Sequence, residues 1–425
     1  MATKHAVVLS GGGAKGAYEI GVMKALLGGH AKTVSDGAEV HPVVYAGTSV
    51  GSYNAAYMVS RPDRSPLVAI AELETIWRNR IASSPTRPNG VLRFRFNPLE
   101  WLDVGRLLAD PLAPLRHFVE DGAFVIKDAA WRAELFLNAK EPLATRFSTL
   151  LDFGAFVSTE AFADLVRGTI DLQAIRSNHE QVLIVAATNW EEGVAVLFSN
   201  RDKHSVESPA SMDDKTGHLA IMASAAIPGV FPAIEVLKKK HVDGGVLLNT
   251  PLEPALRGLR RVAPEDDHVL HVIYLDPNLK DIPLGPGHGT MEALNRLFAL
   301  SFASQVNRDC RHALSINMAL EAGAADETTA SPSGQARPGL RETVRMKPGH
   351  RYSPLTIHRY SPRDLLGGIF GLLAFNADYV NRLIEQGFQD AVAHDCVASG
   401  CIFPRREDAE RVKASRHATS SNVPA

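Results

Sequence analysis

The sequence predicts an α/β protein with a mostly parallel central sheet flanked by helices. Short apolar runs alternate with stretches of helical periodicity, and glycine-rich turns follow two of the predicted strands. The chain has 425 residues, of which 45% are hydrophobic and 22% charged, close to the average for globular proteins. This apolar content is sufficient for a large buried core, so disorder along the whole chain is excluded.

The N-terminal part contains two successive strand–turn–helix units. The sequence predicts strands over 5–9 and 43–46 and helices over 17–27 and 52–59. The loop GGGAKG (11–16) separates the first strand from its helix, and GTSVG (47–51) follows the second strand. Because a right-handed β-α-β crossover makes the two strands parallel, both turns are expected at the same carboxyl edge of the sheet.

The rest of the chain is divided by composition. A helical insertion interrupted by prolines is predicted over about 61–180, and the sheet resumes after it. The later predicted elements are strands over 182–187, 194–198, 234–237, 241–242 and 269–275, and helices over about 217–226, 291–321 and 375–393. We expect a principal domain over 1–280, C-terminal helices over 281–400 that complete it, a variable loop near 323–345 and a disordered tail over 401–425.

Charge and composition exclude several classes of protein. The 45 basic and 47 acidic side chains give a net charge of −2, so no basic field exists for a nucleic-acid partner. The chain has no uncharged apolar run long enough to cross a bilayer and no N-terminal secretory signal. Cys310, Cys396 and Cys401 lack the sequence spacing of a metal site and are interpreted as reduced structural thiols. We therefore expect a cytoplasmic protein without metal or cofactor.

The GTSVG turn matches the G-x-S-x-G pattern of a nucleophile elbow, with Ser49 at its centre. A serine at a tight strand-to-helix turn needs neighbours almost without side chains, which Gly47 and Gly51 supply. The N-terminus of the following helix favours an anion developing near Ser49. The pattern also occurs by chance in ordinary βα turns, so its place between a predicted strand and a predicted helix carries the interpretation.

The GGGAKG loop allows two interpretations. Gly11, Gly13 and Gly16 match the dinucleotide fingerprint G-x-G-x-x-G, which would indicate an NAD(P)-binding oxidoreductase. Alternatively, the amides of Gly11, Gly12 and Gly13 form an oxyanion hole, which the shared sheet edge favours. Lys15 adds weak support, because a cation in the first helical turn is unfavourable unless an anion lies nearby; a solvated surface lysine is the alternative.

A serine nucleophile needs a base, and Asp243 is the best candidate. It follows a short predicted strand and precedes Gly244 and Gly245, so its carboxylate can occupy a tight turn. An unperturbed carboxylate is a weak base for a hydroxyl, so direct contact with Ser49 and partial desolvation are expected. A turn or capping aspartate is the alternative interpretation.

The three motifs occur in the order found in patatin-like phospholipases, and the sequence resembles that family over about residues 4–276. Two further stretches are similar to the family: ASAAIPGVFP (223–232) before the aspartate and NTPL (249–252) after it. The resemblance implies a three-layer fold related to α/β hydrolases. It also implies hydrolysis of lipid or phospholipid acyl esters, of the phospholipase A or lysophospholipase type, through an acyl-enzyme and without metal.

Residue roles follow from the same resemblance. The resemblance implies a Ser–Asp dyad without histidine, in which Ser49 is the nucleophile and Asp243 is the base. It also implies that the amides of Gly11, Gly12 and Gly13 are the oxyanion donors. A Ser–Asp–His triad would instead need a histidine after Asp243, and the candidates are His268, His271, His288 and His312. A catalytically silent lipid- or partner-binding module on the same fold is a further alternative.

The insertion contains a candidate lipid-binding surface. Over residues 91–108, aromatic side chains including Phe96 and Trp101 are interleaved with arginines. Aromatic rings at the bilayer boundary beside arginines at the headgroups would give peripheral membrane contact. A cap packed on the core is the alternative.

Overall fold

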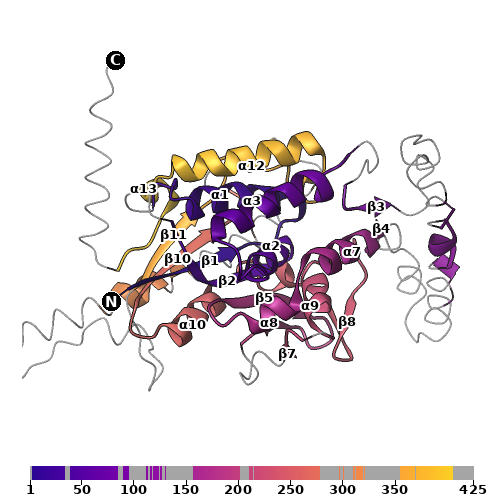
Figure 1. The fold of residues 1–425 in the computed structure, drawn as a ribbon, viewed down its shortest axis with the longest axis horizontal. Helices are drawn as coiled ribbons and strands as arrows, with labels where there is room; N and C mark the ends of the chain where they lie inside the picture. Colours follow the sequence, from indigo (N-terminus) through magenta and orange to yellow (C-terminus); the bar gives the residue numbers. More distant parts are fainter. Residues whose placement is uncertain are drawn as a thin grey trace, which may run out of the picture.

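The computed structural model describes residues 2–33, 39–84, 90–94, 157–201, 210–213, 215–277, 355–368 and 370–404, with isolated residues between 112 and 130 and between 296 and 320. Its centre is a mostly parallel sheet with strand order β11-β10-β1-β2-β5-β6-β7 (Figure 1). These strands are β1 (Thr3–Leu9), β2 (Pro42–Thr48), β5 (Val182–Asn189), β6 (Val194–Ser199), β7 (Ala210–Ser211), β10 (Asp267–Ile273) and β11 (Leu355–Tyr360). A hairpin of β8 (Ile234–Val236) and β9 (Lys239–Asp243) joins the sheet where β9 pairs with β5. The predicted α/β class is therefore confirmed.

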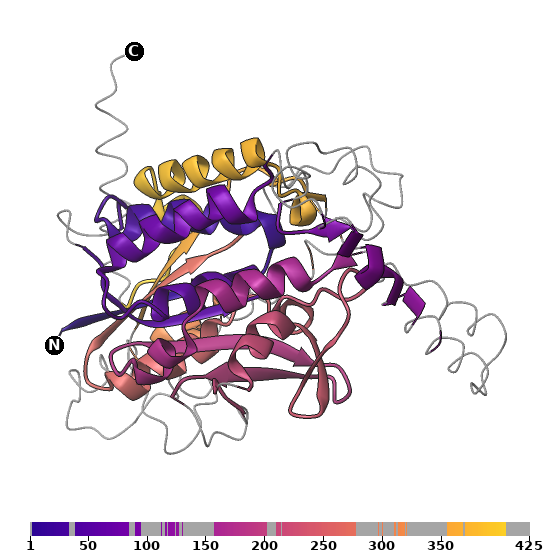
Figure 2. The same ribbon diagram turned by 45° about the vertical axis from the view of Figure 1, so that its right-hand side comes forward.

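Helices cover both faces of the sheet (Figures 1 and 2). One face carries α1 (Ala17–Leu27), α2 (Val50–Val59), α3 (Pro66–Ile76), α7 (Glu160–Thr169), α8 (Leu172–Ser177), α9 (Gly217–Ser224) and α12 (Ala377–Val392). The opposite face packs against α10 (Leu252–Val262). The result is the three-layer arrangement that the sequence predicts.

Alternation along β1 shows how the strands serve two cores. Val7 and Leu9 belong to the core under α1 and α12, whereas Ala6 and Val8 belong to the core under α10. A parallel strand with both faces covered has no solvent-facing side, so its sequence is apolar throughout. This explains why AVVL reads as a continuous run rather than an alternating one.

The C-terminal residues complete this layered domain. Helix α12 lies against α1 so closely that a Cβ on Gly21 would come within 1.9 Å of the Ile384 carbonyl oxygen. Ile402 then forms an antiparallel bridge with Ile357 on β11, and its side chain is buried. The predicted tail over 401–425 therefore begins too early, because Ile402 is paired to the sheet; residues 405–425 lie outside the described part.

The hairpin before Asp243 turns at a different place from the one predicted. The sequence suggests a turn over 238–240, but the turn residues are Leu237 and Lys238, both with left-handed backbone (φ 52° and 63°). A two-residue turn of this hand matches the twist of the flanking strands. Lys239 and Lys240 are consequently part of β9.

The insertion over about 61–180 is described at its two ends. Helices α3, α7 and α8 pack on the core there. Two short strands, β3 (Arg93–Phe94) and β4 (Val157–Ser158), pair with each other in antiparallel orientation. Phe96 and Trp101 lie outside the described residues. Within the described ranges, no helix combines the length and apolar character needed to cross a membrane.

Candidate active site

Ser49 occupies the turn between β2 and α2 with a strained backbone. Its φ of 55° and ψ of −126° are rare for a residue with a side chain. The flanking glycines allow this turn, because a Cβ on Gly47 would lie 2.2 Å from the Gly51 carbonyl oxygen. A Cβ on Gly51 would lie 2.7 Å from the carbonyl oxygen of Leu9. The steric requirement predicted for an elbow is therefore met.

Sheet register brings Asp243 to Ser49. Strand β2 runs parallel to β5 and ends with Thr48 paired to Ala186. Strand β9 runs antiparallel to β5 and ends with Asp243 paired to Ala187, the next residue along. The ends of β2 and β9 thus meet against adjacent residues of β5, which places the serine and the carboxylate together.

The two side chains lie close together. The Asp243 carboxylate accepts a hydrogen bond of 2.7 Å from the Gly245 amide, and a hydrogen-bonding interaction with the Ser49 side chain lowers the pKa of Asp243. Both residues are buried, with 3% of Ser49 and 6% of Asp243 exposed. Burial raises the pKa of Asp243 to about 6, although the two hydrogen bonds oppose the shift. A carboxylate with this pKa is a better proton acceptor than an ordinary one and is still ionised at neutral pH.

Ser224 supports the elbow from the neighbouring helix. Its hydroxyl accepts a hydrogen bond from the Ser49 amide at 2.8 Å and donates to the Ala186 carbonyl at 2.6 Å. Asp243 is held in a similar way, since its amide donates to Ala226. The ASAAIPGVFP stretch therefore fixes the backbone of both residues. Its similarity to the family is visible in the sequence, but the role of Ser224 is not.

The glycine loop lies against the serine. A Cβ on Gly11 would be 3.1 Å from the Cβ of Ser49. The Gly11 amide donates to the Asn249 carbonyl at 3.1 Å, so it is already engaged. Among the described residues, no acceptor is recorded for the amides of Gly12 and Gly13, and Gly13 has a left-handed φ of 56°. These two amides are therefore the donors that remain for an anion.

Lys15 is buried, and the interpretation as a solvated surface lysine is wrong. Its ammonium group forms an ion pair of 2.8 Å with Asp276, which follows β10. Asp276 is the anion that offsets the unfavourable position of a cation in the first helical turn. The pair ties the glycine loop to the neighbouring strand. Gly16, the last residue of the loop, packs against Val50 at the start of α2, because a Cβ on Gly16 would come within 2.6 Å of the Val50 side chain.

Ser49 lies at an apolar cavity, whose empty space is about 540 Å³ when the open solvent at its mouth is included. Apart from Ser49 and Gly13, its walls are hydrophobic: Val50, Tyr53, Trp77, Ile81, Val91, Leu92, Phe162, Leu165, Ala225, Ile227, Phe231, Leu372, Leu373 and Phe375. Part of the wall comes from the short helical turn η9 (Phe370–Leu373), whose Leu372 carbonyl also approaches Gly13. Such a cavity suits a hydrocarbon chain and offers little to a charged or sugar-like group.

The histidines suggested for a triad are used elsewhere. His268 bonds to the Ala263 carbonyl, and His271 to Tyr360 and His5. In the described part of the chain, no hydrogen bond joins a histidine to Ser49 or Asp243. His288 and His312 lie outside the described residues.

The three cysteines, interpreted from sequence as reduced thiols, are all free, and two of them lie beside other polar side chains. Cys396 and Cys401 lie together with two histidines at the far edge of the sheet, whereas Cys310 is buried under Tyr274. Sequence spacing could not show this arrangement, because one of the histidines comes from a strand more than thirty residues earlier in the chain.

A serine on a strained strand-to-helix turn, beside a buried carboxylate and a glycine loop, is the arrangement typical of serine hydrolases with a nucleophile elbow. A family model described as patatin-like phospholipase matches residues 7–256, so the chain belongs to the patatin-like phospholipase family. Members of this family are generally lipid acyl hydrolases.

Other comparisons are distant. The crystal structure of VipD from Legionella pneumophila is similar over 92% of this chain and 66% of that one, with 15% sequence identity and a TM-score of 0.33. This chain therefore spans slightly less than two thirds of that structure. The curated proteins contain no match.

Proposed function

We propose that this protein hydrolyses acyl esters of lipids or phospholipids through a Ser49–Asp243 dyad and an acyl-enzyme intermediate. The observation that carries the proposal is the sheet register that places the buried Asp243 carboxylate beside Ser49, at the mouth of an apolar cavity. No cofactor takes part in the proposed reaction. The substrate class follows from family membership and from the lining of the cavity.

In the first half-reaction, Asp243 accepts the hydroxyl proton while the Ser49 oxygen attacks the acyl carbonyl carbon. The carbonyl electron pair moves to oxygen, and the amides of Gly12 and Gly13 stabilise the resulting oxyanion. When the tetrahedral intermediate collapses, the ester bond breaks and the leaving alcohol takes the proton from Asp243. Gly11 acts on the backbone instead, because its amide is bound to Asn249.

In the second half-reaction, water attacks the acyl-enzyme. Asp243 accepts a proton from the water, and collapse of the second tetrahedral intermediate returns it to the Ser49 oxygen as the fatty acid leaves. The raised pKa of Asp243 suits both transfers, because the same carboxyl must accept and release a proton in each half-reaction.

The surroundings of the loop disfavour the alternative as a nicotinamide-dependent oxidoreductase. A Cβ at Gly13 would lie 2.1 Å from the Leu372 carbonyl oxygen, so η9 packs directly against one side of the loop and leaves less room there for a dinucleotide. Burial of Lys15 in its pair with Asp276 also withdraws the one cation of the loop from a phosphate.

The C-terminal segment belongs to the same catalytic domain in this proposal. Strand β11 extends the sheet, and Leu372, Leu373 and Phe375 line the cavity. This supports a domain that begins in the 1–280 region and is completed by 281–400. Because a lipid substrate is presented at a surface, we also propose peripheral contact between a cytoplasmic enzyme and a membrane.

The test is hydrolysis of a lysophospholipid and of a short-chain p-nitrophenyl ester by wild type, Ser49→Ala and Asp243→Asn. Ser60→Ala is the matched control, because Ser60 ends the same helix and bonds only to that helix and to Arg61. Fluorophosphonate labelling mapped by mass spectrometry should place the adduct on Ser49. Equal turnover by wild type and Ser49→Ala would remove the mechanism, and absence of an adduct with no turnover would favour a silent module.

A further inference from the structure

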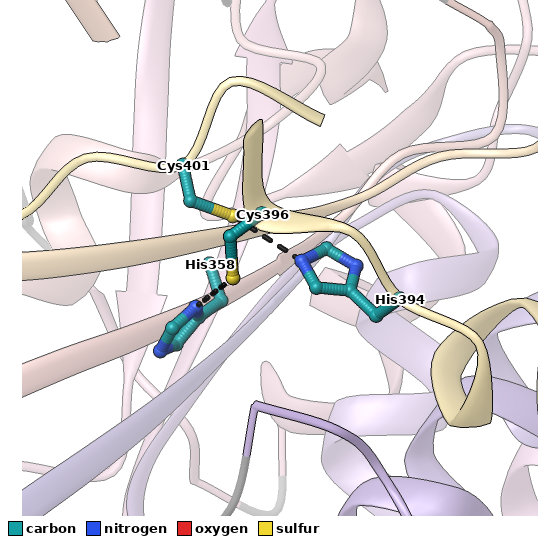
Figure 3. Close-up of side chains that lie close together, drawn as sticks. All are labelled: His358, His394, Cys396 and Cys401. Carbon is teal, nitrogen blue, oxygen red and sulfur yellow. Dashed lines mark hydrogen bonds between the residues drawn. The ribbon is translucent and has the colours of Figure 1, made fainter. Parts of the chain in front are cut away.

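A second group of reactive side chains lies at the β11 edge of the sheet, away from the central strands that carry the dyad. It consists of His358 on β11, His394 after α12, and Cys396 and Cys401 at the start and just beyond the end of α13 (Cys396–Ser399) (Figure 3). The two sulfurs and one ring nitrogen of each histidine all lie within 4.8 Å of one another. Figure 3 shows the four side chains turned toward a common centre.

The spacing of these atoms matches a tetrahedral zinc site. His394 Nε2 is 3.3 Å from Cys401 Sγ, and Cys396 Sγ is 3.7 Å from His358 Nδ1. Tetrahedral geometry with usual Zn–S and Zn–N bond lengths separates a sulfur from a nitrogen by about 3.6 Å. These two distances bracket this value, and the remaining ligand atoms lie within 4.8 Å of one another, close enough to share one ion.

The backbone holds the ligands in place. The Asp395 side chain caps α13 by accepting from the amides of Val397 and Ala398 at 2.9 and 3.0 Å. The Cys401 amide donates to the Cys396 carbonyl at 2.9 Å, which fixes the spacing of the two cysteines. A local turn with this geometry presents both sulfurs on one side.

The fourth ligand is fixed through the sheet. Ile402 and Ile357 exchange two backbone hydrogen bonds of 2.8 and 2.9 Å, which holds the cysteine segment beside His358. The ring of His358 also stacks on that of His271, with centroids 5.5 Å apart. Side-chain packing of this kind fixes the orientation of a ligand ring before metal arrives.

We propose that His358, His394, Cys396 and Cys401 bind one Zn²⁺ ion in a structural site. Two thiolates and two neutral imidazoles are a donor set that zinc prefers, and the two thiolate charges balance the ion in a site whose histidines are buried. Binding releases the two thiol protons to solvent. Because protein atoms occupy all four coordination positions of the ion, no position is left for a substrate or water.

The site would fasten the C-terminal helices to the edge of the sheet. Strand β11 is separated from β2 by β10 and β1, so three strand spacings, about 14 Å, lie between the strand of His358 and the strand that ends at Ser49. Zinc is therefore expected to act on stability and not on the chemistry of the dyad. This inference does not depend on the proposed hydrolase activity.

The test is elemental analysis of the purified full-length chain after removal of any polyhistidine tag. Wild type grown with zinc should contain about one zinc ion per chain, and the Cys396→Ser/Cys401→Ser double variant should contain less than about a tenth of that. Cys310→Ser is the matched control, since Cys310 is a buried thiol outside the cluster, and it should keep the metal. Replacement by Co²⁺ should give the absorption bands of a tetrahedral thiolate complex.

A second measurement uses only the wild type, so it tests the proposal even if the double variant does not fold. Maleimide labelling should be slow at Cys396 and Cys401 with zinc bound and become fast after chelation. A zinc-free wild type, or the same metal content in the double variant, would overturn the proposal. So would a Cys396–Cys401 disulfide found by mass spectrometry in metal-free protein.

Discussion

The Ser49–Asp243 dyad and the four-residue Cys/His cluster both gather side chains from distant parts of the chain at the same sheet. They differ in what the side chains face. Ser49 lies beside Asp243 and otherwise faces an apolar cavity, whereas the members of the cluster face one another. A reactive site keeps one direction open to its substrate, and a structural site uses every direction for its own ligands.

Backbone strain is also placed differently in the two regions. In the dyad, the left-handed conformation falls on Ser49 itself, with φ of 55°. In the cluster, it falls on Gly400, with φ of 69°, where no side chain is strained. Ser49 therefore carries backbone strain that a glycine would avoid, which is expected if its geometry serves the proposed reaction more than stability.

The largest expected effect is that of Ser49→Ala, which should abolish the activity of the dyad and leave the Cys/His cluster unchanged. Ester hydrolysis should fall by about 10⁴-fold or more, because no other group can form the acyl-enzyme. Zinc content should stay the same as in wild type. The measurements are kcat/KM with a p-nitrophenyl ester and metal per chain; a parallel loss of metal would show that the two regions are not independent.

The next effect is the pH dependence imposed by Asp243. Because its pKa is raised to about 6, kcat/KM should be constant above that pH and fall about tenfold per pH unit below it. The residual activity of Asp243→Asn, expected to be lower by about 10²- to 10⁴-fold, should lack this acidic limb. An identical limb in the variant would assign the titration to another group.

The raised pKa of Asp243 also affects stability, and it makes the folded state less stable as the pH rises. A carboxyl whose pKa is higher in the folded state favours folding below its unfolded pKa of 3.8, and this contribution is lost as pH rises through about 6. Asp243→Asn should therefore gain stability relative to wild type between pH 4 and pH 7, by on the order of 3 kcal/mol. Chemical denaturation at both pH values measures the difference, and Asp171→Asn, which alters a surface cap on α8, is the control.

Removal of zinc should affect stability more than turnover. Chelation, or the Cys396→Ser/Cys401→Ser change, should lower the thermal midpoint by roughly 5 °C or more, because metal-binding free energy contributes to folding. Below that midpoint, kcat/KM should stay within about threefold of wild type, since about 14 Å of sheet separates the regions. Immediate loss of activity at low temperature, with the fold intact, would contradict this separation.

The smallest expected effect is the difference in stability between the Ser49→Gly and Ser49→Ala variants. Both variants lack the nucleophile, so their difference in stability isolates the backbone. Glycine accepts the φ and ψ of this turn and alanine does not, so Ser49→Gly should be more stable by about 1–3 kcal/mol. Equal unfolding midpoints in urea would mean that the turn is not strained.

The arrangement around the elbow follows closely from sequence. Gly47, Ser49 and Gly51 can be assigned to a strand-to-helix turn because sterics at such a turn leave few choices of residue. Asp243 can be selected as a base, yet its approach to Ser49 depends on β9 meeting β2 end to end along β5. That pairing is non-local and has no signature in the sequence around Asp243.

Where a side chain depends on a distant partner, the sequence leaves its environment open. The position of Lys15 in the first helical turn indicates a nearby anion, but only the structure identifies this anion as Asp276. The cysteines have no metal-binding spacing, because His358 reaches them through strand pairing and not through a short loop. In both cases the partner is distant in the chain.

By itself, the sequence determined the α/β class, the two glycine turns and the position of Ser49 in the turn between a strand and a helix. Apolar periodicity and the steric demands of glycine are local properties, so they can be recognised without a structure. Tertiary structure alone decided which amides of the glycine loop are free, what surrounds Ser49 and that two cysteines and two histidines share a centre. These depend on strand register and helix packing, which bring together residues that no local pattern relates.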